Sequence, residues 1–153
     1  MFRNLLSRLF SDASGPVTLS GQDAEVAIAA LLVRVARSDD HYGRAEMDRI
    51  DHILACRRRL DRAKAAEHRV AAEMIEAEAP DTVRFTRMIK ERVALEDRAG
   101  IIAAMWQVVL IDGQRDKREE ALVRLVAGLL GVNDRDSALL RQQVTEMLER
   151  KPD

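Results

Sequence analysis

The chain has 153 residues with a formal net charge of −1, from 25 basic and 26 acidic side chains, so its overall charge does not favour nucleic acid as a partner. Its composition, 47% hydrophobic and 33% charged, is typical of a folded domain and excludes a disordered chain. A single cysteine, Cys56, excludes an internal disulfide framework and indicates a reducing compartment.

The N-terminal residues 1–16 are predicted to form an amphipathic segment and a linker, ahead of one domain at residues 17–150. Apolar residues recur at helical spacing within "MFRNLLSRLF", and "SDASGP" has the composition of a linker. Two interpretations stay open for residues 1–10: a short helix folded onto the domain or a frayed end, or a weak basic amphipathic anchor at a membrane surface. No apolar run reaches the ~18 residues that a membrane span needs.

The first half of the domain carries helical signals only. Ser20 and Asp23 form a capping pair for a helix that ends near Ser38. A second helix begins near Arg44, and its apolar side carries Met47, Ile50, Ile53 and Leu54. The next stretch, from Leu60 to Ala79, is rich in alanine and glutamate, with Ala66, Val70, Met74 and Ile75 as its apolar residues.

Further helices follow Pro80, which stops the third one. Asp81 is predicted to cap a helix that turns Phe85, Met88, Ile89 and Val93 inward. After a nearly all-apolar helix that ends at Ile111 comes a helix with the stripe Leu122, Leu125, Val126, Leu129 and Leu130. Gly131 ends that helix, and Asn133 caps a final one that bears Leu139, Leu140, Val144, Met147 and Leu148. We therefore expect a compact all-α bundle of six to seven helices.

Two helices, Ala27–Ala36 and Ile101–Ile111, are apolar almost all round, so they should cross at the centre of the bundle. When the two runs are aligned, Arg34 falls on Gln107, the strongly polar residue of each run. The residues that follow also match, because Asp39 falls on Asp112 and Glu46 falls on Glu119. The chain thus contains two pseudo-repeated units, each an apolar helix, an acidic turn and an amphipathic helix.

The four acids of these turns are candidate metal ligands: Asp39, Glu46, Asp112 and Glu119. Helix capping alone explains the two glutamates, which lie in the first turns of helices. The two aspartates lie at helix C-termini, where an unpaired negative charge costs ~0.3–1 kcal/mol. They would bond to loop amides, pair with arginine, or help to hold a cation.

An EF-hand is excluded in the second turn, because Gln114, Lys117 and Val123 occupy the positions of a ligand, the glycine and the bidentate glutamate. A cation would instead be held by carboxylates from both turns, if the two units pack about a pseudo-twofold axis. Four oxygen ligands suit Ca²⁺, Mg²⁺ or Mn²⁺ better than Zn²⁺. The alternative, two separate turns, remains open from the sequence.

The chain resembles the tellurite-resistance TerB family, in its uncharacterised bacterial branch. The resemblance rests on "AALLVRVARSDDHYGRAEMDRIDHIL" and on "DTVRFTRMIKERVALEDRAGIIAAMWQVVLIDGQRDKREEALVRLVAGLLGVNDRDSALLRQQ". Within the second piece, the "EDR" before the central helix, the "MW" inside it and the "DGxxxxxE" after it carry the match. The first turn departs from the family pattern "DG", because Asp40 follows Asp39 and the first glycine is Gly43.

The resemblance implies an all-α fold of two pseudo-repeated units and a cytoplasmic bacterial protein tied to tellurite or metal stress. It also implies acidic turns that bind metal, at the positions Asp39, Glu46, Asp112 and Glu119, and other tellurite-resistance-type proteins as partners. It implies no enzymatic activity. The partner's identity and the oligomeric state stay open.

An alternative is a metal-free helical module that binds a protein partner, at the inner membrane surface or elsewhere. Its candidate surfaces are the N-terminal segment and the basic stretch Arg57–Lys64. An enzyme is disfavoured, because no metalloprotease, phosphate-loop or nucleophile-elbow motif occurs. Cys56 has no partner cysteine, and with no histidine expected beside it we interpret it as structural or incidental. His52, four residues after Asp48, is interpreted as half of a solvated pair.

Overall fold

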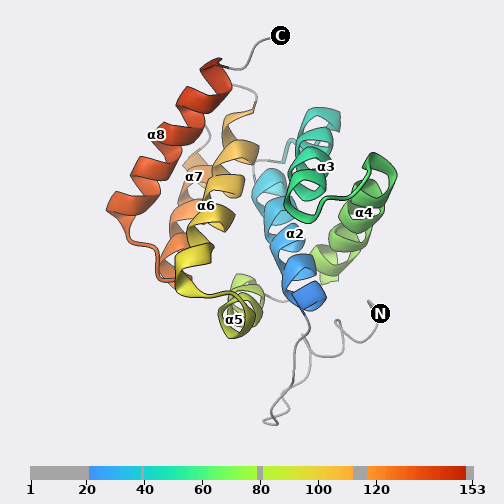
Figure 1. Ribbon diagram of the computed structural model, residues 1–153, viewed down its shortest axis with the longest axis horizontal. Helices are drawn as coiled ribbons and strands as arrows, with labels where there is room; N and C mark the ends of the chain where they lie inside the picture. Colours follow the sequence, from blue (N-terminus) through green and yellow to red (C-terminus); the bar gives the residue numbers. More distant parts are fainter. Residues whose placement is uncertain (1–20, 39, 79–80, 112–116, 151–153) are drawn as a thin grey trace.

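The structure is a computed structural model that describes residues 21–38, 40–78, 81–111 and 117–150 (Figure 1). These residues form seven helices and no strand, as the sequence predicts. They are α2 (Gly21–Arg37), α3 (Arg44–Arg58), α4 (Arg62–Glu78), α5 (Thr82–Arg92), α6 (Leu95–Leu110), α7 (Lys117–Leu129) and α8 (Asp134–Arg150). The N-terminal segment 1–16, the cap Ser20 and the aspartates at 39 and 112 lie outside the described residues. None of the described helices is long and apolar enough to cross a membrane.

Helix α2 lies at the centre of the bundle. From Val26 to Ala36 every side chain except Arg34 is buried, because α2 packs against α3, α4, α5, α6 and α7. Helices α3 and α4 lie on one side of it, and α6, α7 and α8 lie on the other (Figure 1). Helix α6 packs against α2, and Ile101, Ile102 and Met105 on it are fully buried. The prediction that the two apolar helices meet at the centre is therefore confirmed.

The predicted helix ends are confirmed where the structure describes them. The Asp81 side chain accepts a hydrogen bond from the backbone N–H of Arg84 at 3.1 Å and so caps α5. The Asn133 side chain accepts from the N–H of Asp136 at 2.8 Å and caps α8. Gly131, with φ of 83°, takes the left-handed conformation that ends α7. Each end depends on a local residue type, which is why sequence alone could place it.

The predicted apolar stripes are wrong in part. Leu125 on α7 is 53% exposed, and Leu139 and Met147 on α8 are 49% and 47% exposed. Helix α8 packs only against α6 and α7 among the substantial helix contacts, so one narrow face of it is covered. On α4 the exposed residues include Val70 and Met74, while a narrower face, Ala65, Arg69, Ala72 and Ile75, is buried. Helix α4 packs against α2 and α3.

Candidate functional site

The first acidic turn is described from Asp40 onward. Glu46 accepts a hydrogen bond from the backbone N–H of Gly43 at 3.2 Å, so it caps α3 as predicted. Asp40 has φ of 66°, in the left-handed region, at the position where the family pattern has glycine. Aspartate tolerates this conformation better than most residues, which explains how the turn forms without the glycine.

The second acidic turn is described from Lys117 onward, at the start of α7. Glu119 lies in the first turn of α7 and is only 5% exposed. The helix dipole favours a negative charge at this end of a helix. Burial distinguishes Glu119 from Glu46, which is half-buried.

An ion pair joins the two turns. Nη1 of Arg118 lies 3.3 Å from Oδ2 of Asp40, across 78 positions of the sequence. Both side chains are largely exposed, so the pair contributes little to stability. The pair shows instead that the start of α7 lies beside the turn that follows α2. Helices α2 and α6 both run upward in Figure 1.

The described residues alone do not assemble a metal site. Among them, no group of three or more histidine, cysteine, aspartate or glutamate side chains is placed to hold a metal ion. Of the four predicted ligands, Glu46 and Glu119 are described, and Asp39 and Asp112 lie outside the described residues. Whether the four acids converge therefore stays a prediction.

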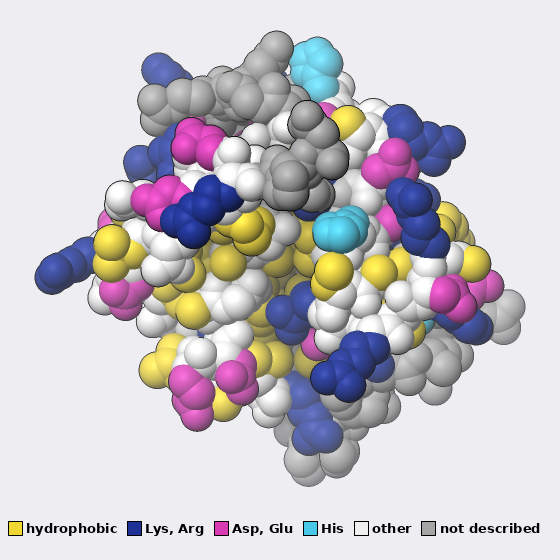
Figure 2. All heavy atoms as spheres, turned by 45° about the horizontal axis from the view of Figure 1, so that its top comes forward, with side chains coloured by type: hydrophobic (Ala, Val, Ile, Leu, Met, Phe, Trp, Pro, Cys, Tyr) yellow, Lys and Arg dark blue, Asp and Glu magenta, His cyan; other side chains and the backbone are white. Residues whose placement is uncertain are grey.

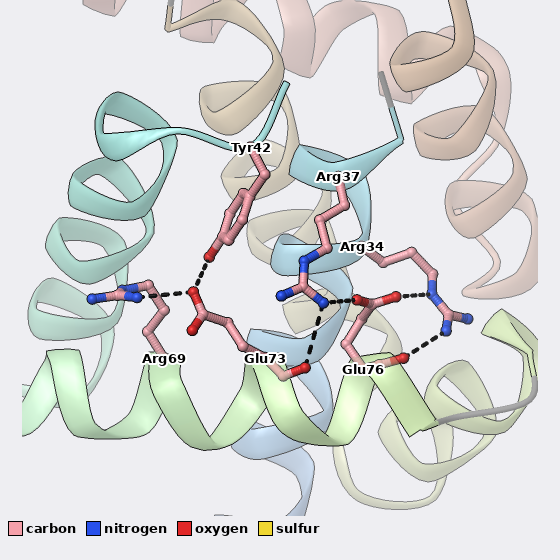
Figure 3. Close-up of polar contacts among 6 residues, drawn as sticks. All are labelled: Arg34, Arg37, Tyr42, Arg69, Glu73 and Glu76. Atoms are coloured by element: carbon pink, nitrogen blue, oxygen red, sulfur yellow. Dashed lines mark hydrogen bonds and ion pairs between the residues drawn. The ribbon is translucent and has the colours of Figure 1, made fainter. Parts of the chain in front are cut away.

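A second group of charges links α2 to α4, and Figure 3 shows it. Glu76 on α4 accepts from Nε of Arg34 at 3.0 Å and from Nη1 of Arg37 at 2.6 Å. Arg34 also donates to Thr82 Oγ1 and lies over the ring of Phe85. In the sequence, Arg34 is the strongly polar residue of an apolar helix. In the structure, its guanidinium forms hydrogen bonds to α4 and to Thr82.

The same helix α4 carries a buried arginine that two carboxylates neutralise. Arg69 donates to Asp51 on α3 at 2.6 Å. Figure 3 shows that it also donates to Glu73, at 2.8 Å, and that Tyr42 donates to Glu73, at 2.5 Å. Burial alone would lower the pKa of Arg69, but the hydrogen bonds to Asp51 and Glu73 outweigh it and raise the pKa. Burial, with the hydrogen bond to Glu73, raises the pKa of Tyr42. This cluster is satisfied internally, so we assign it to stability.

Sequence reasoning missed a cleft between α3, α6 and α8. Its lining includes Arg49, His52 and Cys56 from α3 and Gln107 from α6. The expectation that Cys56 has no histidine beside it is wrong, because His52 Nε2 lies 3.8 Å from its Sγ. One signal for this contact was available, because Cys56 comes four residues after His52 and such a spacing puts both on one face of a helix.

The fold and the turns define a class: all-α bundles whose two central apolar helices each lead into an acidic turn. Residues 25–142 match the family model described as tellurite resistance protein TerB. Since this match covers most of the chain, the protein belongs to the TerB family. No curated protein and no solved structure matches it.

Proposed function

We propose that this TerB-family domain is a non-catalytic cytoplasmic module of the metal or tellurite stress response that binds a divalent cation at its paired acidic turns. The observation that supports the proposal is the ion pair between Arg118 and Asp40, in which the start of α7 lies beside the turn residue Asp40. Carboxylates from both turns would supply oxygen ligands of the kind that Ca²⁺, Mg²⁺ and Mn²⁺ prefer.

The electrostatics of the turns support the same proposal. Asp39 and Asp112 follow the C-terminal ends of α2 and α6, where the helix dipole disfavours a negative charge. A cation would remove that cost at both ends together. Glu119, buried in the first turn of α7, would add a carboxylate from the second unit. Glu46 uses Oε2 for capping, which leaves its second oxygen for a ligand bond.

The test is a thermal melt of the full chain with Ca²⁺, Mg²⁺, Mn²⁺ or Zn²⁺. An ion that binds only the folded state stabilises it by about 2.7 kcal/mol at a hundredfold excess over Kd. For a domain of this size that corresponds to a rise in Tm of about 5–10 °C. Asp112→Asn should lose the response, while Asp48→Asn, an exposed acid of α3 outside the turns, should keep it.

Two results would reject the cation site. The first is an unchanged Tm with all four ions. The second is a response of Asp112→Asn equal to that of the wild type, because the carboxylate that the site requires would then be dispensable.

A further inference from the structure

The cleft between α3, α6 and α8, defined above by Arg49, His52, Cys56 and Gln107, has a volume of about 730 Å³. This volume lies within the range of small-molecule binding sites. In Figure 2, the face turned forward is hollowed, with hydrophobic side chains in the hollow and Lys and Arg side chains beside it. The cleft residues come from the bodies of α3, α6 and α8, and neither Glu46 nor Glu119, the described acids of the turns, is among them.

Arg49 is the unusual residue of this cleft. It is only 7% exposed, and its Nε is buried without a hydrogen-bond partner. Within the described parts of the chain, no carboxylate forms an ion pair with it. Burial lowers the pKa of Arg49 from its ordinary value, and the nearby Cys56 acts in the opposite direction. An arginine still stays charged at neutral pH, so the cleft wall holds a buried positive charge.

The other charges of the cleft are compensated. Arg57 pairs with Glu25 through two contacts, at 3.2 and 3.3 Å. Arg150 lies 3.4 Å from Glu146 on the same helix. Arg49 is therefore the cation of the cleft that lacks a counter-charge among the described residues. Burying such a charge opposes folding, and an anion bound in the cleft would offset this cost.

The rest of the lining indicates what else the ligand must have. Ile53 on α3 and Ala104 on α6 are 4% and 3% exposed, and Met147 and Leu148 face them from α8. A bare inorganic anion would fill little of the cleft and would leave the side chain of Met147, which is 47% exposed, in contact with water. A single uncompensated positive charge matches a carboxylate better than a phosphate, which carries about −1.5 to −2.

We propose that this cleft binds a small amphiphile, with one carboxylate on Arg49 and an apolar body against Ile53, Ala104 and Met147. The guanidinium presents hydrogen-bond donors in a fixed planar arrangement that suits a carboxylate. The methionine is a flexible, polarizable side chain that adapts to apolar ligands of different shape. This proposal does not depend on the metal site.

The experiment uses the full chain and decanoate as the probe, with decanol as an uncharged ligand of equal length and acetate as the head group alone. Cys56 is the single cysteine, is exposed and lines the cleft, so its rate of alkylation by iodoacetamide reports on occupancy. Saturating decanoate should slow that alkylation at least tenfold. Calorimetry should give a Kd for decanoate at least tenfold lower than for decanol, and acetate should bind far more weakly than either.

Arg49→Met should bring the Kd values of decanoate and decanol to within about twofold of each other, because the head group loses its partner. The matched control is Arg87→Met, an exposed arginine of α5 outside the cleft, which should keep the wild-type preference. The measurements of decanoate, decanol and acetate on the wild-type protein test the proposal even if Arg49→Met fails to fold. Equal affinity for decanoate and decanol, no binding of either, or acetate binding as tightly as decanoate would each overturn the proposal.

Discussion

Arg49 and Arg69 make a matched pair, because each is 7% exposed and they differ in their partners. Arg69 is neutralised by Asp51 and Glu73, whereas Arg49 has no ion-pair partner in the described structure. We therefore predict that replacing each arginine with methionine changes stability in opposite directions. Methionine keeps much of the apolar stem, so the comparison isolates the guanidinium.

The magnitudes follow from burial. Arg69→Met leaves the carboxylates of Asp51 and Glu73, whose side chains are 11% and 17% exposed, without their cation. Removing one partner of a buried pair costs ~3–5 kcal/mol, and the residual exposure favours the lower figure. For a domain of this size the Tm should fall by about 6–12 °C. Arg49→Met removes a buried charge that no carboxylate of the described residues compensates, so stability should rise by ~1–3 kcal/mol.

Urea unfolding at neutral pH, followed by circular dichroism, measures both changes. Arg87→Met, the exposed control, should stay within ~0.5 kcal/mol of the wild type. The double variant Asp51→Leu with Arg69→Met should recover part of the loss, since one stranded carboxylate is then gone. If Arg49→Met is destabilised as strongly as Arg69→Met, burial alone determines the loss of unfolding free energy. The argument that ion-pair partners determine the sign of the change would then be wrong.

Three further predictions concern single residues. Asp40→Gly should stabilise the protein by ~0.5–1 kcal/mol in urea unfolding, because Asp40 has φ of 66° and its pair with Arg118 is exposed, and a loss of stability would contradict this. Arg59→Gly, at φ of 54° after α3, should add ~1 kcal/mol, while Arg59→Val should lower stability in the same assay. The raised pKa of Tyr42 means that only the unfolded state ionises just above pH 10, so stability is intact below pH 10 and declines above it. Absorbance of the single tyrosine should show no tyrosinate in the folded protein at pH 10, and Tyr42→Phe should lose less stability above that pH than the wild type.

The sequence predicted most of the fold, because helix ends and apolar periodicity are local properties. Asp81, Gly131 and Asn133 each end or begin a helix through contacts within five residues. The central position of α2 and α6 followed from their apolar circumference. The same argument failed for Leu125 and Met147, since spacing shows that a residue is on a face but not whether another helix covers that face.

The polar contacts could be predicted only in part. Capping by Glu46 was predictable because its partner, Gly43, is three residues away. The partner of Arg34 is Glu76, which is 42 positions away, and no local pattern indicates that pairing. The spacing of Arg69 and Glu73, four residues apart, is compatible with a pair on one helix, but Asp51 is 18 positions from Arg69 and no local pattern indicates that contact. The aspartates at 39 and 112 remain a prediction from sequence.

The burial of α2 on all sides predicts how the protein behaves when the chain is cut into two fragments. Its side chains are covered partly by α3 and α4, from the first unit, and partly by α5, α6 and α7, which come later. A fragment cut within the connection between α4 and α5 would expose one whole side of this apolar rod to water. Neither fragment should persist as a soluble monomer, and mixing the two should restore a noncovalent whole.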